Sequence, residues 1–458
     1  MLQLQINSSF SRFFFHVLVF SLGIGAPFSL YAAKLGETPG LTALQSTTGT
    51  AIQTVCKGLG AAGNTPTPDP QSAEQDLFNQ CNAMVHTGNQ LQPDVGGPTT
   101  NSLNLTNEEL GGALQNVATE EMATPSRVSM STLSGQVAKI NDHLSLLHKV
   151  SQGTGGGSGD EENSLLSNNL SFFVNGMGGF GDTQSSDLEN AADFYSAGLV
   201  LGLDYRITNN FVSGLAFGYS HQGVDFQKNI NVSGGQLDSD SYNLSLFASY
   251  DLDDFYFDGN FTYGWNNYDM TRGVVVLSNN ISSPGGANRV AKAETNGEQF
   301  STGFGFGYNY HHNAFNLNPY ARLSYAHGQM DSYSEQGAYG LNLNVDEQNF
   351  DSLQSLLGVQ LSYVFSHSYG VIIPRFNVGW HHEFLNDSRA ITARYLSDFN
   401  NNILTAVTDN PDRDFATLGF GVSNVFQGGL QLFINYQALL GYQNINSNAF
   451  SGGARFEF

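Results

Sequence analysis

The sequence has few charged residues, and basic residues are especially scarce. Only 12% of its 458 residues are charged, whereas soluble globular domains carry about 25%. The 17 lysines and arginines are outnumbered by 40 aspartates and glutamates, which gives a formal net charge of -23. Because phosphate binding needs clustered basic side chains, the composition excludes nucleic acid as a partner. The acidity fits loops that face the cell exterior; the alternative is that it only keeps an exported protein soluble.

Beyond the amino terminus, the sequence has no apolar run of the length, about 18 residues, that a spanning helix needs. If the protein crosses a membrane, it does so with strands. At the amino terminus, Arg12 precedes an apolar run over residues 13–30, and Ala32 and Ala33 follow. This order is typical of a secretory signal peptide, which we assign to residues 1–33. An uncleaved membrane anchor is the alternative.

Cysteine is also scarce, with only Cys56 and Cys81 present. Two cysteines without a matched pair of histidines cannot complete a tetrahedral zinc site. After export the two residues lie in an oxidising compartment, where a pair of cysteines is more often bridged than free. We therefore predict a disulfide between Cys56 and Cys81.

Catalytic motifs are missing as well. The sequence contains neither a Gly-x-Ser-x-Gly elbow nor a His-Glu-x-x-His helix. Of the 11 histidines, three occur singly in predicted helices and four form two adjacent pairs: His86, His143, His148, His311-His312 and His381-His382. Neighbours on a strand point to opposite faces, so neither pair can share one metal ion from one strand. We predict no enzyme activity, no metal and no cofactor; a surface hydrolase with an unrecognised site is the alternative.

Residues 34–150 have a helical pattern. Apolar side chains recur at spacings of three and four over residues 41–59 and 72–91, with glycine and proline breakers at 63–70 between them. This pattern predicts a helical hairpin held by the disulfide. A third helix is predicted over residues 126–150, roughly 36 Å long at 1.5 Å per residue. That length suffices to thread a bilayer-sized pore; packing on the other two helices is the alternative.

The rest of the chain has the period of β-strands. A glycine-rich linker at residues 151–166 is followed, over 167–458, by apolar residues that alternate with small or polar ones. In one stretch Phe211, Leu215 and Phe217 alternate with residues such as Gly214. About twelve spans can be counted, an even number as in bacterial membrane barrels.

Charge placement and turn length distinguish a membrane barrel from a soluble sandwich. Arg or Lys facing lipid costs about 2–4 kcal/mol at mid-membrane, whereas a wet lumen accepts charge. The charged residues lie opposite the apolar face: Asp204, Arg206, Asp258, Arg322, Arg375, Glu383, Arg455 and Glu457. Short turns are predicted at 208–210, 251–254, 311–313, 366–368 and 427–429, and longer polar stretches at 177–191, 222–238, 267–296, 329–350 and 385–411. The predicted fold class is an all-β transmembrane barrel of about twelve antiparallel strands, preceded by a short, mainly α-helical passenger or plug.

Four segments carry a family resemblance. They are Gly-Leu-Asp-Tyr-Arg at 202–206, Pro-Tyr-Ala-Arg-Leu-Ser-Tyr at 319–325, Trp-His-His-Glu-Phe at 380–384 and Gly-Gly-Ala-Arg-Phe-Glu-Phe at 452–458. In this order they resemble the autotransporter β-domain of type V secretion, over roughly residues 170–458. The resemblance implies a barrel in the outer membrane of a Gram-negative cell, in contact with outer-membrane lipid and lipopolysaccharide. The terminal pattern with Phe456 and Phe458 is similar to the signal read by the outer-membrane barrel assembly machinery.

In that family the segment before the barrel, the passenger, reaches the cell surface. Here residues 34–150 would form a short passenger without the long β-helical repeats of many members. The resemblance thus implies display or translocation of this passenger, in an adhesive or structural role with an unspecified host or surface ligand. A plugged, porin-like barrel is another alternative. Asn168-Asn169 is similar to the tandem asparagine at which some members cleave, but the helix context is missing and we expect no cleavage.

Overall fold

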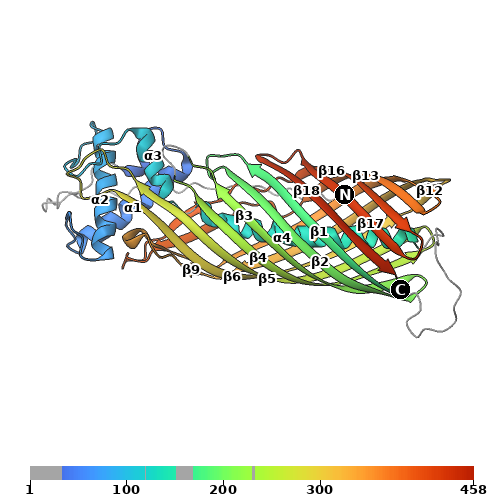
Figure 1. Ribbon diagram of the computed structural model, residues 1–458. Helices are drawn as coiled ribbons and strands as arrows, with labels where there is room; N and C mark the ends of the chain where they lie inside the picture. The colour runs from blue at the N-terminus through green and yellow to red at the C-terminus, as the bar shows by residue number, and fades with distance from the viewer. Residues whose placement is uncertain (1–33, 119, 151–168, 229–232, 458) are drawn as a thin grey trace, which may run out of the picture.

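A closed barrel of twelve antiparallel strands makes up most of the molecule (Figure 1). The computed structural model describes residues 34–118, 120–150, 169–228 and 233–457; the predicted signal peptide, the linker and Phe458 lie outside these ranges. The barrel strands are β1 (Leu170–Thr183), β2 (Ala192–Thr208), β3 (Phe211–Phe226), β4 (Gly235–Leu252), β5 (Phe255–Val276), β6 (Ala287–Tyr308), β8 (Phe315–Met330), β11 (Gln348–Tyr363), β13 (Gly370–Glu383), β16 (Asp414–Phe426), β17 (Leu430–Leu440) and β18 (Ile445–Glu457). The predicted fold class is therefore confirmed.

The barrel closes because its last strand returns to its first. β1 pairs with β2 on one side and with β18 on the other, in a register that runs from Ser171↔Glu457 to Thr183↔Ile445. Two short strands, β7 (Tyr310–His312) and β12 (Phe365–His367), extend the hairpins at one end. Closure pairs the backbone groups that an open edge would expose to lipid.

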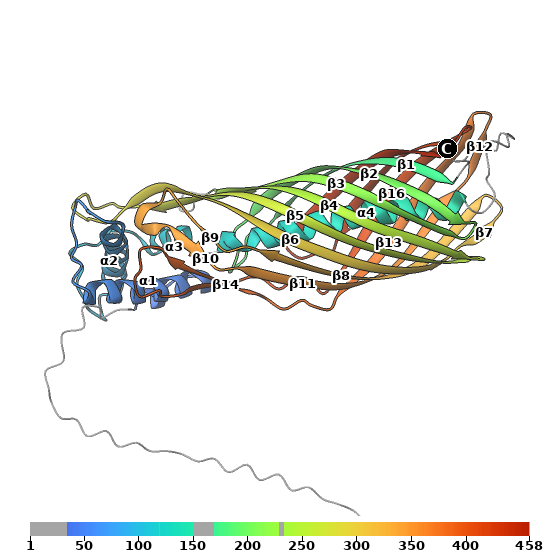
Figure 2. The ribbon, with the colours of Figure 1, turned by 90° about the horizontal axis from the view of Figure 1, so that it is seen from below.

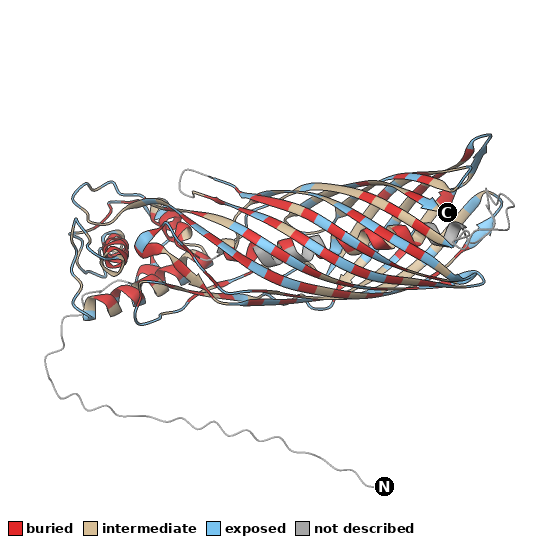
Figure 3. Ribbon diagram, turned by 60° about the horizontal axis from the view of Figure 1, so that its bottom comes forward, coloured by how far each residue is buried: buried red, intermediate tan, exposed pale blue. Residues whose placement is uncertain are grey.

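The two faces of the wall have the predicted characters. Along most of the barrel strands, more exposed and less exposed residues alternate, which gives the striped wall in Figure 3. Leu199, Leu201 and Leu203 of β2 are exposed on the outside, whereas Asp204 is 2% exposed and Arg455 3% exposed. The apolar face therefore meets lipid and the charged face lines the lumen, as the sequence predicts.

The five predicted short turns all connect strands at the end that also holds the end of β18 (Figures 1 and 2). Asp253 and Asn313 adopt positive φ in two of these turns, a conformation that Asp and Asn tolerate well. Because bacterial barrels have their short turns on the periplasmic side, the opposite end is the outer mouth.

The predicted long loops at 222–238 and 267–296 are wrong in extent. Strands β3 to β6 continue through most of these stretches, and the connections shrink to residues 227–234 and 277–286. β5 and β6 each reach 22 residues. Where a strand leaves the bilayer, its outward face no longer has to be apolar, so the apolar alternation ends although the pairing continues.

The segment before the barrel is helical. It contains η1 (Leu35–Glu37), α1 (Ala43–Ala61), α2 (Ala73–Leu91), α3 (Asn107–Asn116), η2 (Glu120–Ala123) and α4 (Thr124–Val150). Thr42 begins α1 with a capping box to Gln45, and the side chain of Ser72 caps α2, which fixes the starts of the predicted hairpin helices. Within the described ranges, none of the helices is long and apolar enough to cross a membrane.

The long outer connections of the barrel form a second, smaller sheet. Its order is β15-β14-β10-β9, with β9 (Tyr333–Ser334) and β10 (Leu343–Val345) between β8 and β11, and β14 (Ala390–Tyr395) and β15 (Leu404–Val407) between β13 and β16. The short helix η3 (Tyr339–Leu341) joins β9 to β10. We call η1, α1, α2 and α3 the cap, and this sheet the loop sheet. The cap lies at the outer mouth, and α4 runs inside the barrel toward the short turns (Figure 2).

Candidate functional site

The cap and the barrel mouth share one hydrophobic core. Buried residues of α1 and α2, such as Ile52 and Leu77, belong to the same cluster as Val274 and Val276 of β5. The loop sheet joins this cluster through residues including Leu343, Ile391 and Leu404. Burial of each such aliphatic side chain contributes about 1.5–3 kcal/mol. The cap is therefore packed onto the barrel rather than tethered to it.

Hydrogen-bonded ion pairs fix the orientation of α2 on the barrel. Arg289 of β6 donates from Nη1 to Asp76 Oδ2 at 2.6 Å and from Nη2 to Asp76 Oδ1 at 2.8 Å. The backbone N–H of Gly340 in η3 also donates to Asp76 Oδ2, at 3.0 Å. A Cβ on Gly340 would lie 2.5 Å from Ala73 O and Leu77 N, so only glycine allows η3 to approach α2 this closely. Asp76 thus ties a cap helix to a barrel strand and to the loop that carries η3.

A second buried pair joins the end of α3, the barrel and the loop sheet. Arg272 of β5 donates to Glu335 through Nε at 2.8 Å and Nη2 at 2.6 Å, and both side chains are almost fully buried. Arg272 Nη1 also donates to Asn116 O of α3 at 2.8 Å, and Glu335 Oε2 accepts from Leu343 N of β10 at 2.9 Å. Such a pair is stable in the interior because further hydrogen bonds satisfy both partners.

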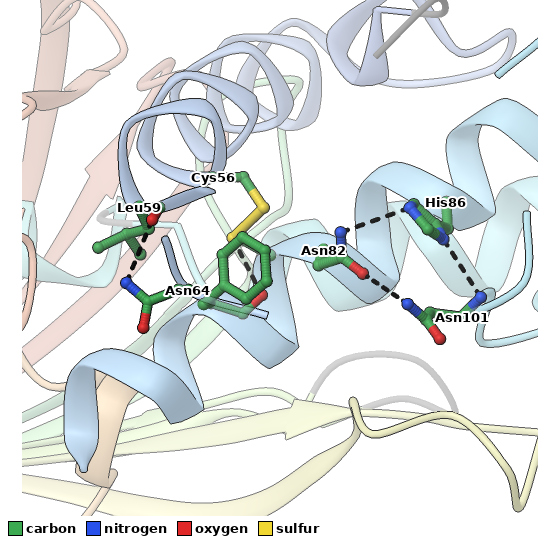
Figure 4. Close-up of a disulfide and its surroundings, with 8 residues drawn as sticks. Cys56, Leu59, Asn64, Asn82, His86 and Asn101 are labelled. Carbon is green, nitrogen blue, oxygen red and sulfur yellow. Dashed lines mark hydrogen bonds between the residues drawn. A yellow bond between two sulfur atoms is a disulfide. The ribbon is translucent and has the colours of Figure 1, made fainter. Parts of the chain in front are cut away.

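Cys56 of α1 and Cys81 of α2 form a disulfide, with their Cα atoms 5.5 Å apart (Figure 4). Both residues are fully buried in the cap core, and the bridge links the two helices of the predicted hairpin. Just after α1, the Asn64 side chain donates to the backbone O of Leu59 at 3.1 Å and so fixes the path of the chain as it leaves the helix.

We expect Cys56 and Cys81 to resist alkylation in the exported protein until a reductant is added. Closing a loop of this length is expected to stabilise the cap by roughly 3–4 kcal/mol. Mass-shift thiol labelling under denaturing conditions, with and without reductant, measures the bridged fraction. Two cysteines that react fully without reductant would contradict the prediction.

His86 of α2 is a buried, neutral histidine of the cap. Its Nδ1 accepts the backbone N–H of Asn101 at 3.2 Å, and its Nε2 lies 3.4 Å from Asn82 Nδ2 (Figure 4). The Asn101 side chain donates to Asn82 Oδ1 at 3.0 Å, which completes the ring of contacts. Burial lowers the pKa of His86. A proton on Nδ1 would break the bond from Asn101.

The cap should therefore lose stability in mild acid. The pKa of His86 is lower in the folded protein than in the unfolded chain, where it is about 6.5. The unfolded chain then binds the proton more readily, so stability is lost as the pH falls below about 6.5, by at most about 1.4 kcal/mol per pH unit. Protease resistance of the cap, followed between about pH 7.5 and pH 5, should decline more steeply in the wild type than in His86→Asn, whose Oδ1 can replace the Nδ1 acceptor. Identical pH profiles would refute the assignment.

α4 is packed inside the lumen, which excludes its packing on the other two helices alone. Ile140 and Leu144 share a buried cluster with Phe173, Val200 and Phe247 of the barrel wall. Polar contacts accompany this cluster. Gln136 Nε2 donates to Ser245 Oγ at 3.3 Å, and Asn260 Nδ2 donates to Asn141 Oδ1 at 3.3 Å. Of the two alternatives that the sequence left open, the structure shows the helix inside the pore, with a length of roughly 40 Å for 27 residues.

A buried polar contact of α4 lies at the barrel seam, where β1 pairs with β18 and β2. His143 Nε2 is 2.9 Å from Asp204 Oδ2 of β2, and the imidazole stacks on Phe173 at 3.8 Å between ring centroids. Arg455 of β18 lies 3.3 Å from Asp204 Oδ1 and donates to Ser171 Oγ of β1 at 2.6 Å. These residues join the helix to the first two strands and to the last one. We call His143, Asp204, Arg455 and Ser171 the seam network.

Cross-strand histidine contacts mark the outer limit of the lipid-facing surface. The Nδ1 atoms of three outward histidines approach carboxylates: His221 and Asp240 at 3.2 Å, His327 and Asp351 at 2.9 Å, and His382 and Asp414 at 2.8 Å. Tyrosines also donate to these acids, as Tyr219 does to Asp240 at 2.7 Å. Tyrosine rings and polar groups are typical of the membrane interface. The bilayer therefore ends below the cap.

The two histidines of the pair at 381–382 have different contacts. His381 contacts Thr417 Oγ1 at 3.1 Å, whereas His382 contacts Asp414 on the outward face. His311 Nδ1 contacts Asn316 at the short-turn end of the barrel. The side chain of His148 lies outside the described part of α4.

The sequence alone does not identify Asp76, Arg289, Arg272 or Glu335 as cap contacts, because their partners are remote in the chain.

The comparisons with known proteins agree with this architecture. Residues 172–437 match the family model described as autotransporter beta-domain. The translocator domain of the autotransporter NalP from Neisseria meningitidis is 17% identical, covers 72% of this chain and 99% of its own, and has a TM-score of 0.49. The beta domain of the Bordetella autotransporter BrkA, also 17% identical, covers 63% of this chain and 100% of its own, with a TM-score of 0.45.

Curated relatives match over part of the chain. Esterase EstA of Pseudomonas aeruginosa is 30% identical over 174 residues, which are 36% of this chain and 25% of the relative. An extracellular serine protease of Serratia marcescens is 27% identical over 189 residues, 41% of this chain and 17% of the relative. The chain thus spans a quarter or less of these relatives. From the family match and the closed barrel, the chain belongs to the autotransporter beta-domain family and is an outer-membrane protein.

Proposed function

We propose that residues 34–118 form a permanently docked surface cap, with a structural or adhesive role and without enzyme activity. The observation that carries this proposal is the hydrophobic core that runs from α1 and α2 into β5 and the loop sheet without interruption. A passenger that is released, or that moves freely on its linker, would not bury its own side chains against the barrel. The ion pairs of Asp76 and Glu335 with barrel strands add to this support.

The path of the chain supports export through the barrel or together with it. The cap lies at the outer mouth, α4 descends inside the lumen, and β1 begins at the short-turn end (Figure 2). Residues that precede α4 therefore lie on the opposite side of the membrane from the start of β1. We infer that α4 is the last part of the passenger to enter the barrel and that it remains in the lumen. There it blocks the pore through which the cap was exported.

The polar pair in the lumen supports a docking role rather than catalysis. His143 and Asp204 form an imidazole–carboxylate pair, which is also a component of hydrolytic triads. Here the ring of His143 lies against Phe173 and Phe247, and its Nε2 is the atom that contacts the carboxylate. The pair therefore gives no support for esterase or protease activity in this chain.

The proposal can be tested on intact cells. An epitope inserted at Gly96-Gly97, an exposed connection after α2, should be stained by antibody without permeabilisation. A matched epitope in the periplasmic turn at Gly428-Gly429 should be stained only after permeabilisation. The cap should also remain with the cells and be absent from the medium. Staining of the first epitope only in permeabilised cells, or recovery of the cap from the medium, would refute a docked surface cap.

The assembly machinery is a further proposed partner, through the end of β18. Phe450 and Phe456 face lipid, at 48% and 39% exposure, and Phe458 lies outside the described residues. Replacing Phe458 with serine should strongly lower outer-membrane levels and leave chains in the periplasm. Losing one buried Phe costs only about 1.5–3 kcal/mol, too little to unfold such a barrel. Membrane fractionation measures the effect; Phe450→Ser is the matched control, and equal levels of the two variants would contradict a terminal signal.

A further inference from the structure

The barrel wall is uneven in height at its outer end. β5 and β6 each extend over 22 residues, whereas β16, β17 and β18 have 13, 11 and 13. The outer connection between β17 and β18 is only the turn at residues 441–444. At this low side of the mouth, two adjoining cavities lie between α4, the ends of the strands and the outer connections.

The inner chamber is mainly apolar. It has a volume of about 300 Å³, at the lower limit of the range of small-molecule sites, roughly 300–1,000 Å³. Its lining includes Val128 of α4 and a set of apolar wall residues: Phe194, Val224, Phe226, Phe415, Leu439 and Ile445. α4 also presents the small side chains of Ser131 and Ser134 to the chamber. Polar side chains such as Gln222 and Gln354 also line the chamber, so an apolar guest would lie against its apolar side, as in most small-molecule sites.

The outer vestibule is larger and acidic. It has a volume of about 690 Å³ and shares Glu189, Phe415 and Tyr442 with the inner chamber. Besides Asp351, which contacts His327 on the outward face, its lining contains five carboxylates, Asp187, Glu189, Glu383, Asp409 and Asp412, but only two guanidinium groups, those of Arg127 and Arg389. Arg127 forms an ion pair with Glu189 where the two cavities meet. Negative charge therefore predominates in the vestibule.

We propose that the two cavities together bind a small amphiphile with an apolar body and a cationic head. The inner chamber takes the apolar body, and the acidic vestibule holds an ammonium group. Tyr442 and Phe415 line both cavities, so their rings can face the head group, and aromatic faces attract cations. The low wall at β16 to β18 gives the ligand access from outside, above the lipid-facing surface. The chamber borders the core that docks the cap, because Val224 and Phe226 belong to both.

The binding experiment uses the full-length protein in nanodiscs and three probes that share a phenyl ring on a four-carbon chain and carry different head groups. Calorimetry should show that 4-phenylbutylamine binds about tenfold more tightly than 4-phenylbutyrate, with 4-phenyl-1-butanol between them, because several carboxylates act on the head group. Empty nanodiscs measure partition into lipid. No binding beyond that of empty nanodiscs, or equal or tighter binding of the carboxylate, would overturn the proposal.

Variants assign the two halves of the site. Ser131→Phe should fill the inner chamber and abolish binding of all three probes, and Ser134→Phe should do the same if the first variant assembles poorly. Ser282→Phe, an equal change on an exposed outer loop, should bind like the wild type. Asp187→Asn combined with Asp409→Asn should weaken the amine several-fold and leave the alcohol unchanged. Amine binding that survives both chamber-filling variants would refute the site, whatever the outcome of the surface-staining test of the cap.

Discussion

Glu335→Gln is expected to destabilise the junction of the cap and the barrel by about 3–5 kcal/mol. Glutamine keeps the shape of the side chain but removes the charge that neutralises Arg272, and both residues are almost fully buried. The guanidinium cannot reach water without unpacking α3 from β5, since Arg272 also donates to Asn116 O. Hydrogen exchange of the α2 and α3 amides should accelerate on the order of 10² to 10⁴-fold, measured by mass spectrometry.

A matched double variant separates charge from packing. Arg272→Met combined with Glu335→Leu removes both charges and keeps apolar volume, but Leu343 N also loses its acceptor. Its exchange rates should therefore lie between those of the wild type and Glu335→Gln. Amides in β17, remote from the junction, should be unaffected in either variant. If Glu335→Gln left the protection of α3 unchanged, the pair would not hold the cap on the barrel.

Deleting residues 34–165 should convert a closed protein into an ion channel. The barrel hydrogen bonds are made by strand pairing, including the β1–β18 seam, and none of these pairings requires the cap or α4. The fragment should therefore insert into membranes, migrate anomalously on unboiled gels and unfold on boiling. Removing α4 also exposes polar lumen residues such as Asp258 and Arg375 to a water-filled channel.

Planar bilayer recordings should show discrete conductance steps for this fragment and no steps for the full-length protein. His143→Ala is the matched control, because it weakens the seam network but leaves α4 in the lumen; it should show at most brief openings. A fragment that is soluble and monomeric without detergent, or an inserted fragment that never conducts, would contradict the assignment of α4 as the plug.

Local patterns in the sequence predicted the barrel strands and the long helices. The alternation in segments such as 211–219 and the charges at Asp204 and Arg455 define both faces of the wall, because the bilayer imposes opposite requirements on them. α3 was not predicted, although Thr106 and Glu109 form a capping box at its start. This Thr-x-x-Glu signal was available in the sequence and could have located the helix.

Other features could not be read from the sequence. The strands of the loop sheet have two to six residues, too few for alternation to stand out in a polar loop. Asp76 lies in the first turn of α2, where an acidic residue ordinarily complements the helix dipole. Its partner Arg289 is 213 residues away, so their contact depends on the closed barrel and not on any local pattern.

The seam network also imposes an order of events on biogenesis. Arg455 is translated 284 residues after Ser171, the residue to which it donates a hydrogen bond. His143 precedes both of them and depends on Asp204, which Arg455 in turn holds. Until β18 pairs with β1, Arg455 is not in place to contact Ser171 and Asp204. The contacts that hold the carboxylate partner of His143 are therefore complete only when the barrel is closed.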